Sequence, residues 1–98
     1  MANITYNVAS VGSSAYALTN VSTGISGNNL SLSINLGDTL ILNVIAPGHP
    51  FYVKTQAGTG TGNQASLVSN NGATNGTVTF IPQSAGTYYY QCSIHSSM

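Results

Sequence analysis

Apolar and polar residues alternate along much of this chain, which is the period expected of a half-buried β-strand. The clearest case runs from Leu30 to Leu36, where four aliphatic side chains are separated by Ser31, Ser33 and Asn35. No segment has the 3.6-residue period of an amphipathic helix. The pattern predicts further strands at residues 3–9, 15–21, 51–55, 65–68, 77–81 and 87–92, and the apolar run at 39–45 predicts a strand covered on both faces.

Segments rich in Gly, Asn and Ser or Thr separate these predicted strands, and the longest such region is residues 56–76, where only 65–68 is predicted as a short strand. Within it, residues 58–62 alternate Gly and Thr, but a phosphate-binding loop would also need a lysine and a following helix. We therefore expect a flexible connection there. A chain of 98 residues is long enough for one hydrophobic core. The sequence predicts one all-β domain over residues 1–98, built as an antiparallel β-sandwich.

The last eleven residues concentrate the side chains that could bind a soft metal ion. Cys92, His95 and Met98 follow one another with the spacing Cys-x-x-His-x-x-Met, directly after a predicted strand. A thiolate, imidazoles and a weak axial thioether are the ligands of mononuclear copper sites that transfer electrons. His49 is the only other histidine, and it lies on a loop fixed by the Pro residues around it. These four residues are the candidate metal ligands.

Each candidate also has a plainer interpretation. A lone cysteine such as Cys92 is often a small buried apolar residue. Cys92 and His95 could form a nucleophile and base, although no nearby residues supply an orienting carboxamide and oxyanion donors. His49 could be an ordinary loop histidine, and Met98 could be frayed. In the last predicted strand, alternation places Tyr88, Tyr90 and Cys92 on one face, and Tyr89 and Gln91 on the other.

Charge excludes several classes of function, because Asp38 and Lys54 are the only charged side chains. A nucleic-acid binder or a surface-bound membrane protein needs a basic face, so neither nucleic acid nor a membrane surface is expected as a partner.

No apolar segment is long enough to insert into a membrane, and no signal peptide is recognisable. The polar, neutral composition suits an extracytoplasmic or virion-surface location.

Several segments together resemble the cupredoxin family of type 1 copper proteins, which includes amicyanin and plastocyanin. The resemblance rests on His49 after an apolar strand and on the spacing of Cys92, His95 and Met98, which is similar to that of amicyanin. The segments Gly37-Asp38-Thr39-Leu40 and Ala85-Gly86-Thr87-Tyr88-Tyr89-Tyr90 belong to the same likeness. The chain also looks like cupredoxin-like modules of marine phage structural proteins.

The resemblance implies a Greek-key sandwich that binds one copper ion per chain. His49, Cys92 and His95 would be the equatorial ligands and Met98 the axial one. Pro50 stands where many cupredoxins have Asn, and it has no N–H to donate to the cysteine sulfur, so we expect a shifted potential or a weaker site.

The implied function is one-electron transfer with a redox partner protein and without catalysis. Two alternatives remain open. One is copper storage or delivery. The other is a structural module that contacts neighbouring subunits of a virion or cell surface, with a vestigial metal site.

Overall fold

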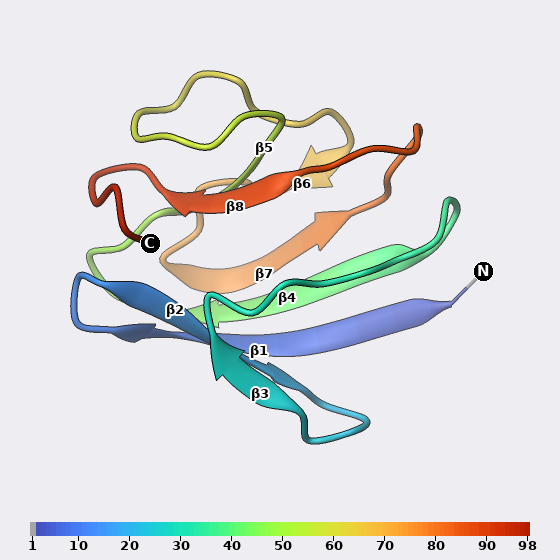
Figure 1. The fold of residues 1–98 in the computed structure, drawn as a ribbon, viewed down its shortest axis with the longest axis horizontal. Helices are drawn as coiled ribbons and strands as arrows, with labels where there is room; N and C mark the ends of the chain where they lie inside the picture. Colours follow the sequence, from blue (N-terminus) through green and yellow to red (C-terminus); the bar gives the residue numbers. More distant parts are fainter. Residues whose placement is uncertain (1) are drawn as a thin grey trace.

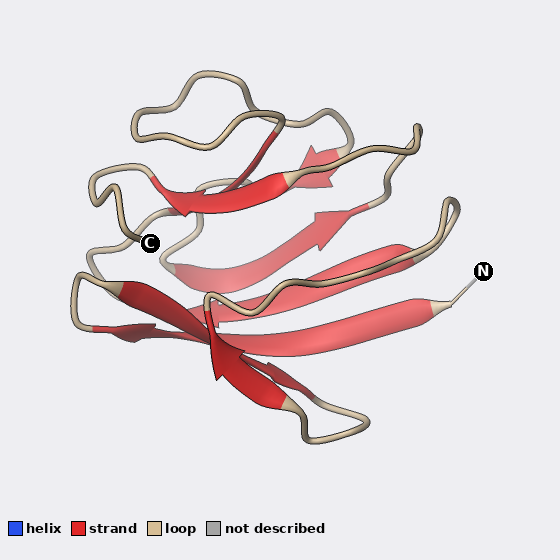
Figure 2. Cartoon of the chain, viewed as in Figure 1, coloured by secondary structure: helices blue, strands red, loops and turns tan. Residues whose placement is uncertain are grey.

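The computed structural model describes residues 2–98, and within them every regular element is a β-strand (Figures 1 and 2). No helix in this part of the chain could span a membrane. The eight strands are β1 (Asn3–Val11), β2 (Ala15–Asn20), β3 (Ser26–Asn28), β4 (Thr39–Ile45), β5 (Phe51–Lys54), β6 (Val68–Ser69), β7 (Asn75–Phe80) and β8 (Tyr89–Cys92). The all-β prediction is confirmed.

Six strands form one sheet in the order β3-β2-β1-β4-β7-β6. Neighbouring strands are antiparallel except at the centre, where β1 and β4 run parallel, with Asn3 opposite Thr39 and Ala9 opposite Ile45. The prediction of a purely antiparallel fold is therefore wrong. The chain leaves β1 through β2, β3 and a long crossover before it returns as β4, and that path brings it back in the same direction.

The second layer is an antiparallel pair of strands, β5 and β8. Its register places Phe51 opposite Cys92 and Lys54 opposite Tyr89. In Figure 1 this pair lies above β7, β4 and β1 of the six-stranded sheet, and the C-terminus turns back between the two layers. The arrangement is a sandwich-like fold with layers of very unequal size.

The predicted strand at Leu30–Leu36 is wrong as a paired element, because it belongs to neither sheet. Alternation correctly identified its inward side chains, since Leu30, Leu32 and Ile34 pack against the core. Alternation reports which side chains are buried, whereas a strand also needs a neighbouring backbone. The predicted strand at 65–68 is also largely wrong, because only Val68–Ser69 pairs with β7.

The core lies between the two layers. Tyr16 of the large sheet joins them, because its ring meets that of Phe51 in the small layer edge to face with centroids 4.9 Å apart. Within the small layer, Phe51 is stacked on Tyr90 with ring centroids 5.4 Å apart. Burial raises the pKa of Tyr90 to about 12, so its hydroxyl stays protonated and donates to the Leu30 carbonyl at 2.6 Å. Other apolar side chains of the large sheet complete the core: Val8, Leu18, Leu40, Leu42, Val44, Val78 and Phe80.

Candidate metal centre

His49 stands on the loop between β4 and β5. Pro47 and Gly48 turn the chain there, with Gly48 at a φ of 80°, where a residue with a side chain would be strained. The turn is closed by the His49 N–H, which donates to the Ala46 carbonyl at 3.0 Å. The Tyr16 hydroxyl donates to the His49 carbonyl at 2.8 Å. These bonds fix the backbone that carries this imidazole.

The other candidate ligands come from the end of β8 and the segment after it. Cys92 is the last residue of β8 and is fully buried, and its N–H donates to the Met98 carbonyl at 3.3 Å. The Met98 N–H in turn donates to the His95 carbonyl at 3.2 Å. The Ser93 N–H donates to the Pro50 carbonyl at 3.2 Å, which ties this loop to the one that carries His49. Two loops distant in sequence are thereby joined.

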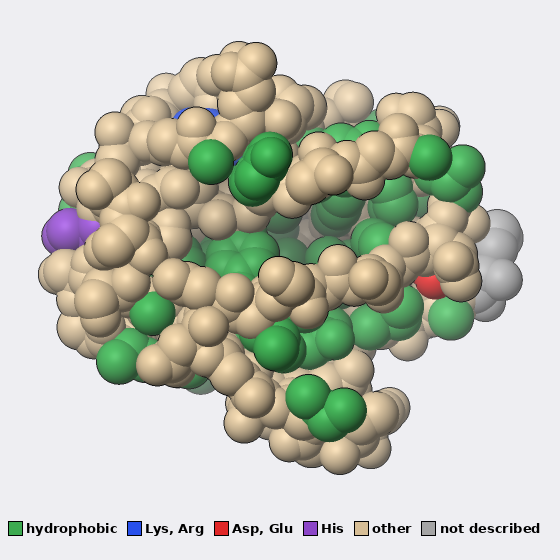
Figure 3. Space-filling view, viewed as in Figure 1, with side chains coloured by type: hydrophobic (Ala, Val, Ile, Leu, Met, Phe, Trp, Pro, Cys, Tyr) green, Lys and Arg blue, Asp and Glu red, His purple; other side chains and the backbone are tan. Residues whose placement is uncertain are grey.

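The three donor side chains converge at this end of the sandwich. The Nδ1 atoms of His49 and His95 are 3.2 Å apart, and the Cys92 sulfur lies 3.4 Å from the His95 Nδ1 and 3.9 Å from the His49 Nδ1. The two imidazole rings are tilted by 43° with centroids 4.8 Å apart. The thiol is buried while both histidines are half-buried. Figure 3 shows histidine at the surface of this end of the molecule.

These spacings suit a single small metal ion. Bonds of about 2.0 Å to imidazole nitrogen and about 2.3 Å to thiolate sulfur, arranged tetrahedrally, separate two nitrogens by about 3.3 Å and nitrogen from sulfur by about 3.5 Å. The two Nδ1 atoms are 3.2 Å apart, close to the first value, and the two distances from sulfur to nitrogen, 3.4 and 3.9 Å, lie on either side of the second. His49, Cys92 and His95 could therefore hold a metal ion with little movement.

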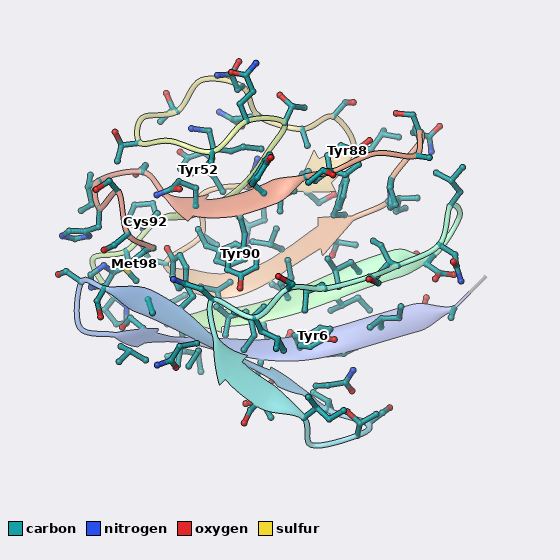
Figure 4. All side chains as sticks on the ribbon, in the orientation of Figure 1. Tyr6, Tyr52, Tyr88, Tyr90, Cys92 and Met98 are labelled. Carbon is teal, nitrogen blue, oxygen red and sulfur yellow. The ribbon has the colours of Figure 1, made fainter. Side chains whose placement is uncertain are left out.

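Met98, the fourth candidate ligand, lies at the same end of the sandwich. Its side chain is buried in the core, and its backbone is hydrogen bonded to Cys92 and His95. Figure 4 shows Met98 and Cys92 near each other at this end. The loop is further held by the Asn29 side-chain amide, which donates to the Ser97 carbonyl at 3.0 Å. The residue is anchored in place, contrary to the interpretation of Met98 as a frayed end.

The thiol of Cys92 has an aromatic hydroxyl as its neighbour. Burial, and secondly the adjacent Cys92, raise the pKa of Tyr16 well above its usual range. Its hydroxyl therefore stays protonated and remains a donor to the His49 carbonyl. Tyr16 thus supports the site. Sequence analysis missed this role, because it placed Tyr16 only within the predicted strand 15–21.

Gln91 is a second supporting residue that sequence analysis missed. It is buried, although alternation places it on the face opposite Cys92. Its amide nitrogen donates to the carbonyls of Cys92 at 3.1 Å and His95 at 2.8 Å, and its amide oxygen accepts from the Gly58 N–H at 3.4 Å. One side chain therefore joins the segment after β8, residues 93–98, to residues 58–62, which we call the Gly-rich loop. Gln91 is buried because that loop covers its part of the outer face of β8, whereas Tyr89 on the same face is 42% exposed.

Lys54 holds the Gly-rich loop in place. Its side chain is only 2% exposed, and its ammonium donates to the carbonyls of Gly58 at 2.7 Å and Gly60 at 3.2 Å. The Gly60 N–H then donates to the Ser93 carbonyl at 2.7 Å. The sequence did contain a signal for this role of Lys54. It is the only Lys or Arg in the chain, and it stands at the end of a predicted strand, just before a loop in which glycines leave the backbone carbonyls accessible. Carbonyl oxygens can satisfy a buried ammonium.

No family model, curated protein or solved structure matches this chain. A functional assignment therefore rests on the geometry of the residues alone.

Proposed function

We propose that this protein binds one copper ion through His49, Cys92 and His95 and carries single electrons without turning over a substrate. The proposal rests on one observation: the two imidazole nitrogens and the buried Cys92 sulfur lie close enough together for one metal ion to bind all three. In this proposal Met98 would supply a thioether as a further, weak donor. The fold would then be of the Greek-key cupredoxin type, in an extracytoplasmic setting.

The ligand types favour copper over other metals. Thiolate is a soft donor and imidazole a borderline one, a combination that both Cu(I) and Cu(II) accept, so a bound copper ion would supply a one-electron couple. Cys92 is fully buried beside Phe51, which keeps water from the sulfur. The hydrogen bonds of Gln91 and of the His49 turn hold the ligand backbones in one geometry. A rigid ligand set limits rearrangement when the charge on the metal changes.

The direct test is titration of the purified protein with Cu(II), followed by visible and electron paramagnetic resonance spectra. We expect one equivalent to bind, with an intense thiolate-to-copper absorption that Cys92→Ser abolishes. His49→Ala and His95→Ala should each weaken binding, whereas Met98→Leu should leave the colour and raise the potential. Colourless or non-stoichiometric binding would refute the proposal. An unchanged potential in Met98→Leu would remove only Met98 from the site.

One observation favours a second candidate function, a structural module in a virion or cell-surface assembly. Both charged side chains, Asp38 and Lys54, are buried, so the surface formed by residues 2–98 has no charged side chain. A diffusing electron carrier usually gains its association rate from charge complementarity with its partner. Sedimentation analysis distinguishes the two candidates, since a structural module should self-associate or bind its assembly partner whether or not copper is present.

A further inference from the structure

Lys54 carries the only positively charged side chain in the sequence, and that side chain is buried under the Gly-rich loop. The only acidic side chain, Asp38, is hydrogen bonded elsewhere, to the N–H groups of Ala2 and Asn35. Figure 3 shows acidic and histidine side chains at opposite ends of the molecule. The Lys54 ammonium is therefore held by uncharged carbonyl oxygens, and no acidic side chain neutralises its charge.

Two routes of contacts join this ammonium to the segment that carries the candidate metal ligands. The ammonium donates to the Gly60 carbonyl at 3.2 Å, and the Gly60 N–H donates at 2.7 Å to the carbonyl of Ser93, the residue after the candidate thiolate ligand. The ammonium also donates to the Gly58 carbonyl at 2.7 Å, and the Gly58 N–H donates to the side chain of Gln91 at 3.4 Å. The buried Gln91 amide donates in turn to two carbonyls of the ligand segment. The buried charge thus lies beside the metal centre.

The separation and the medium decide whether that charge acts on a bound ion. Lys54 stands three residues along β5 from Phe51, which is opposite Cys92, and three residues of a strand span roughly 10 Å. Buried side chains, Gln91 and Phe51 among them, fill this part of the small layer, so water screens the charge little. At an effective dielectric constant of about 20, two unit charges roughly 10 Å apart change an equilibrium constant by about tenfold.

We propose that Lys54 determines the charge selectivity of the metal site, favouring a monovalent over a divalent ion, and so raises the reduction potential of bound copper. This role of Lys54 rests on the proposed function. The ammonium repels Cu(II) more than Cu(I), because Cu(II) carries one more positive charge. When an external one-electron donor passes its electron to the site, Cu(II) becomes Cu(I) and the repulsion by Lys54 falls by one unit charge. Lys54 therefore stabilises the reduced state relative to the oxidised one.

Three variants of this residue separate its charge from its hydrogen bonds. Lys54→Gln is neutral but keeps an N–H donor, Lys54→Met is neutral without a donor, and Lys54→Arg keeps the charge. Competition with chelators measures the Cu(I) and Cu(II) dissociation constants of each protein, and titration with a one-electron mediator couple measures the reduction potential. Both neutral variants should lose about tenfold in preference for Cu(I), a fall of about 59 mV for one electron. Lys54→Arg should stay within about threefold of the unchanged protein.

A matched control tests the effect of burial. Thr55→Lys adds a positive charge one residue further along, at an exposed position, where water and salt screen it, so the preference should change less than about twofold. Ag(I) and Cd(II) repeat the comparison with soft ions that stay monovalent and divalent. Both neutral variants should lose about tenfold in preference for Ag(I) over Cd(II), since the charge difference is the same as that between the two copper states.

Visible and electron paramagnetic resonance spectra of the Cu(II) form separate charge from ligand geometry. The spectra of Lys54→Gln should match those of the unchanged protein, because only the charge near the site differs. A lower potential accompanied by altered spectra in both neutral variants would assign the effect to ligand geometry and overturn the inference. Unchanged preferences in both neutral variants, or an equal loss in Lys54→Arg, would also overturn it and leave copper binding intact. If the unchanged protein bound none of the four ions, the proposed function itself would be refuted, and this role of Lys54 with it.

Discussion

The six-stranded sheet and the β5–β8 layer differ in the side-chain contacts that add to the backbone pairing within each layer. In the sheet, the four inner strands have neighbours on both sides and bury aliphatic side chains such as Leu18, Leu42 and Val78. The small layer has one backbone pairing, and buried polar side chains, Lys54 and Gln91, join its strands to the surrounding loops. Apolar burial depends little on direction, whereas hydrogen bonds fix orientation. The candidate metal ligands lie where orientation is fixed.

The largest effect is expected from Leu42→Ala in the centre of the large sheet. Leu42 is 1% exposed, so truncation should leave a cavity and lower the free energy of unfolding by about 2–5 kcal/mol. Ile45→Ala on the same strand is the control, because Ile45 is 67% exposed and its truncation should change stability by less than about 0.5 kcal/mol. Urea denaturation measures both. Equal losses would show that the sheet does not depend on its buried face.

Lys54→Met tests the polar support of the small layer. The variant keeps the length of the side chain but leaves the Gly58 and Gly60 carbonyls without their charged donor, and it should lower the free energy of unfolding by about 1.5–3 kcal/mol. Thr55→Val is the control on the next residue, where an exposed hydroxyl bonds to the Asn63 carbonyl. Hydrogen exchange should quicken at Gly60 in the first variant only. Unchanged exchange there would mean that Lys54 does not hold the loop.

Gln91→Leu should act on the metal site more than on the fold. Loss of its amide leaves the His95 carbonyl without that donor and frees the ligand loop, so copper affinity should fall about 10- to 100-fold. Gln64→Leu is the matched control, since Gln64 is exposed and its amide bonds only within its own region. Competition with a chelator measures the affinity. A fall in stability with unchanged affinity would make Gln91 a purely structural residue.

The smallest effect concerns Asp38, which joins the start of the chain to the turn before β4. N–H groups of Ala2 at 2.9 Å and Asn35 at 3.0 Å donate to its carboxylate and hold the pKa of Asp38 below its usual value. The folded pKa lies below the unfolded one, so this contribution to stability is present above the unfolded pKa of about 3.9 and is lost as pH falls through the folded pKa.

Urea denaturation between pH 5 and pH 2 measures this dependence. Asp38 is the only acidic side chain in the sequence, so Asp38→Asn should flatten most of the fall in stability with acid. An unchanged slope in the variant would assign the acid dependence to other groups.

Local periodicity was enough to predict the all-β class, most of the strands and the inward side chains of Leu30, Leu32 and Ile34, although Leu36 in the same alternation is exposed. It could not predict pairing, because a ladder depends on which backbones meet in space. The parallel contact of β1 with β4 and the unpaired state of Leu30–Leu36 were consequently mispredicted. The same limit applies to Gln91, since a residue on the outer face of a strand is buried only if a distant loop covers it.

For the candidate site, the sequence by itself determined which donors exist: one thiol, two imidazoles and one thioether other than that of the first residue. Because the chain has only two histidines, His49 was the only residue that could add a second imidazole to the donors of the Cys92–Met98 loop. The tertiary structure decided that the two loops meet with donor atoms 3.2 to 3.9 Å apart, and that Tyr16, Gln91 and Lys54 hold them there. Donor chemistry belongs to individual residues, whereas the distances between donors depend on how the whole chain packs.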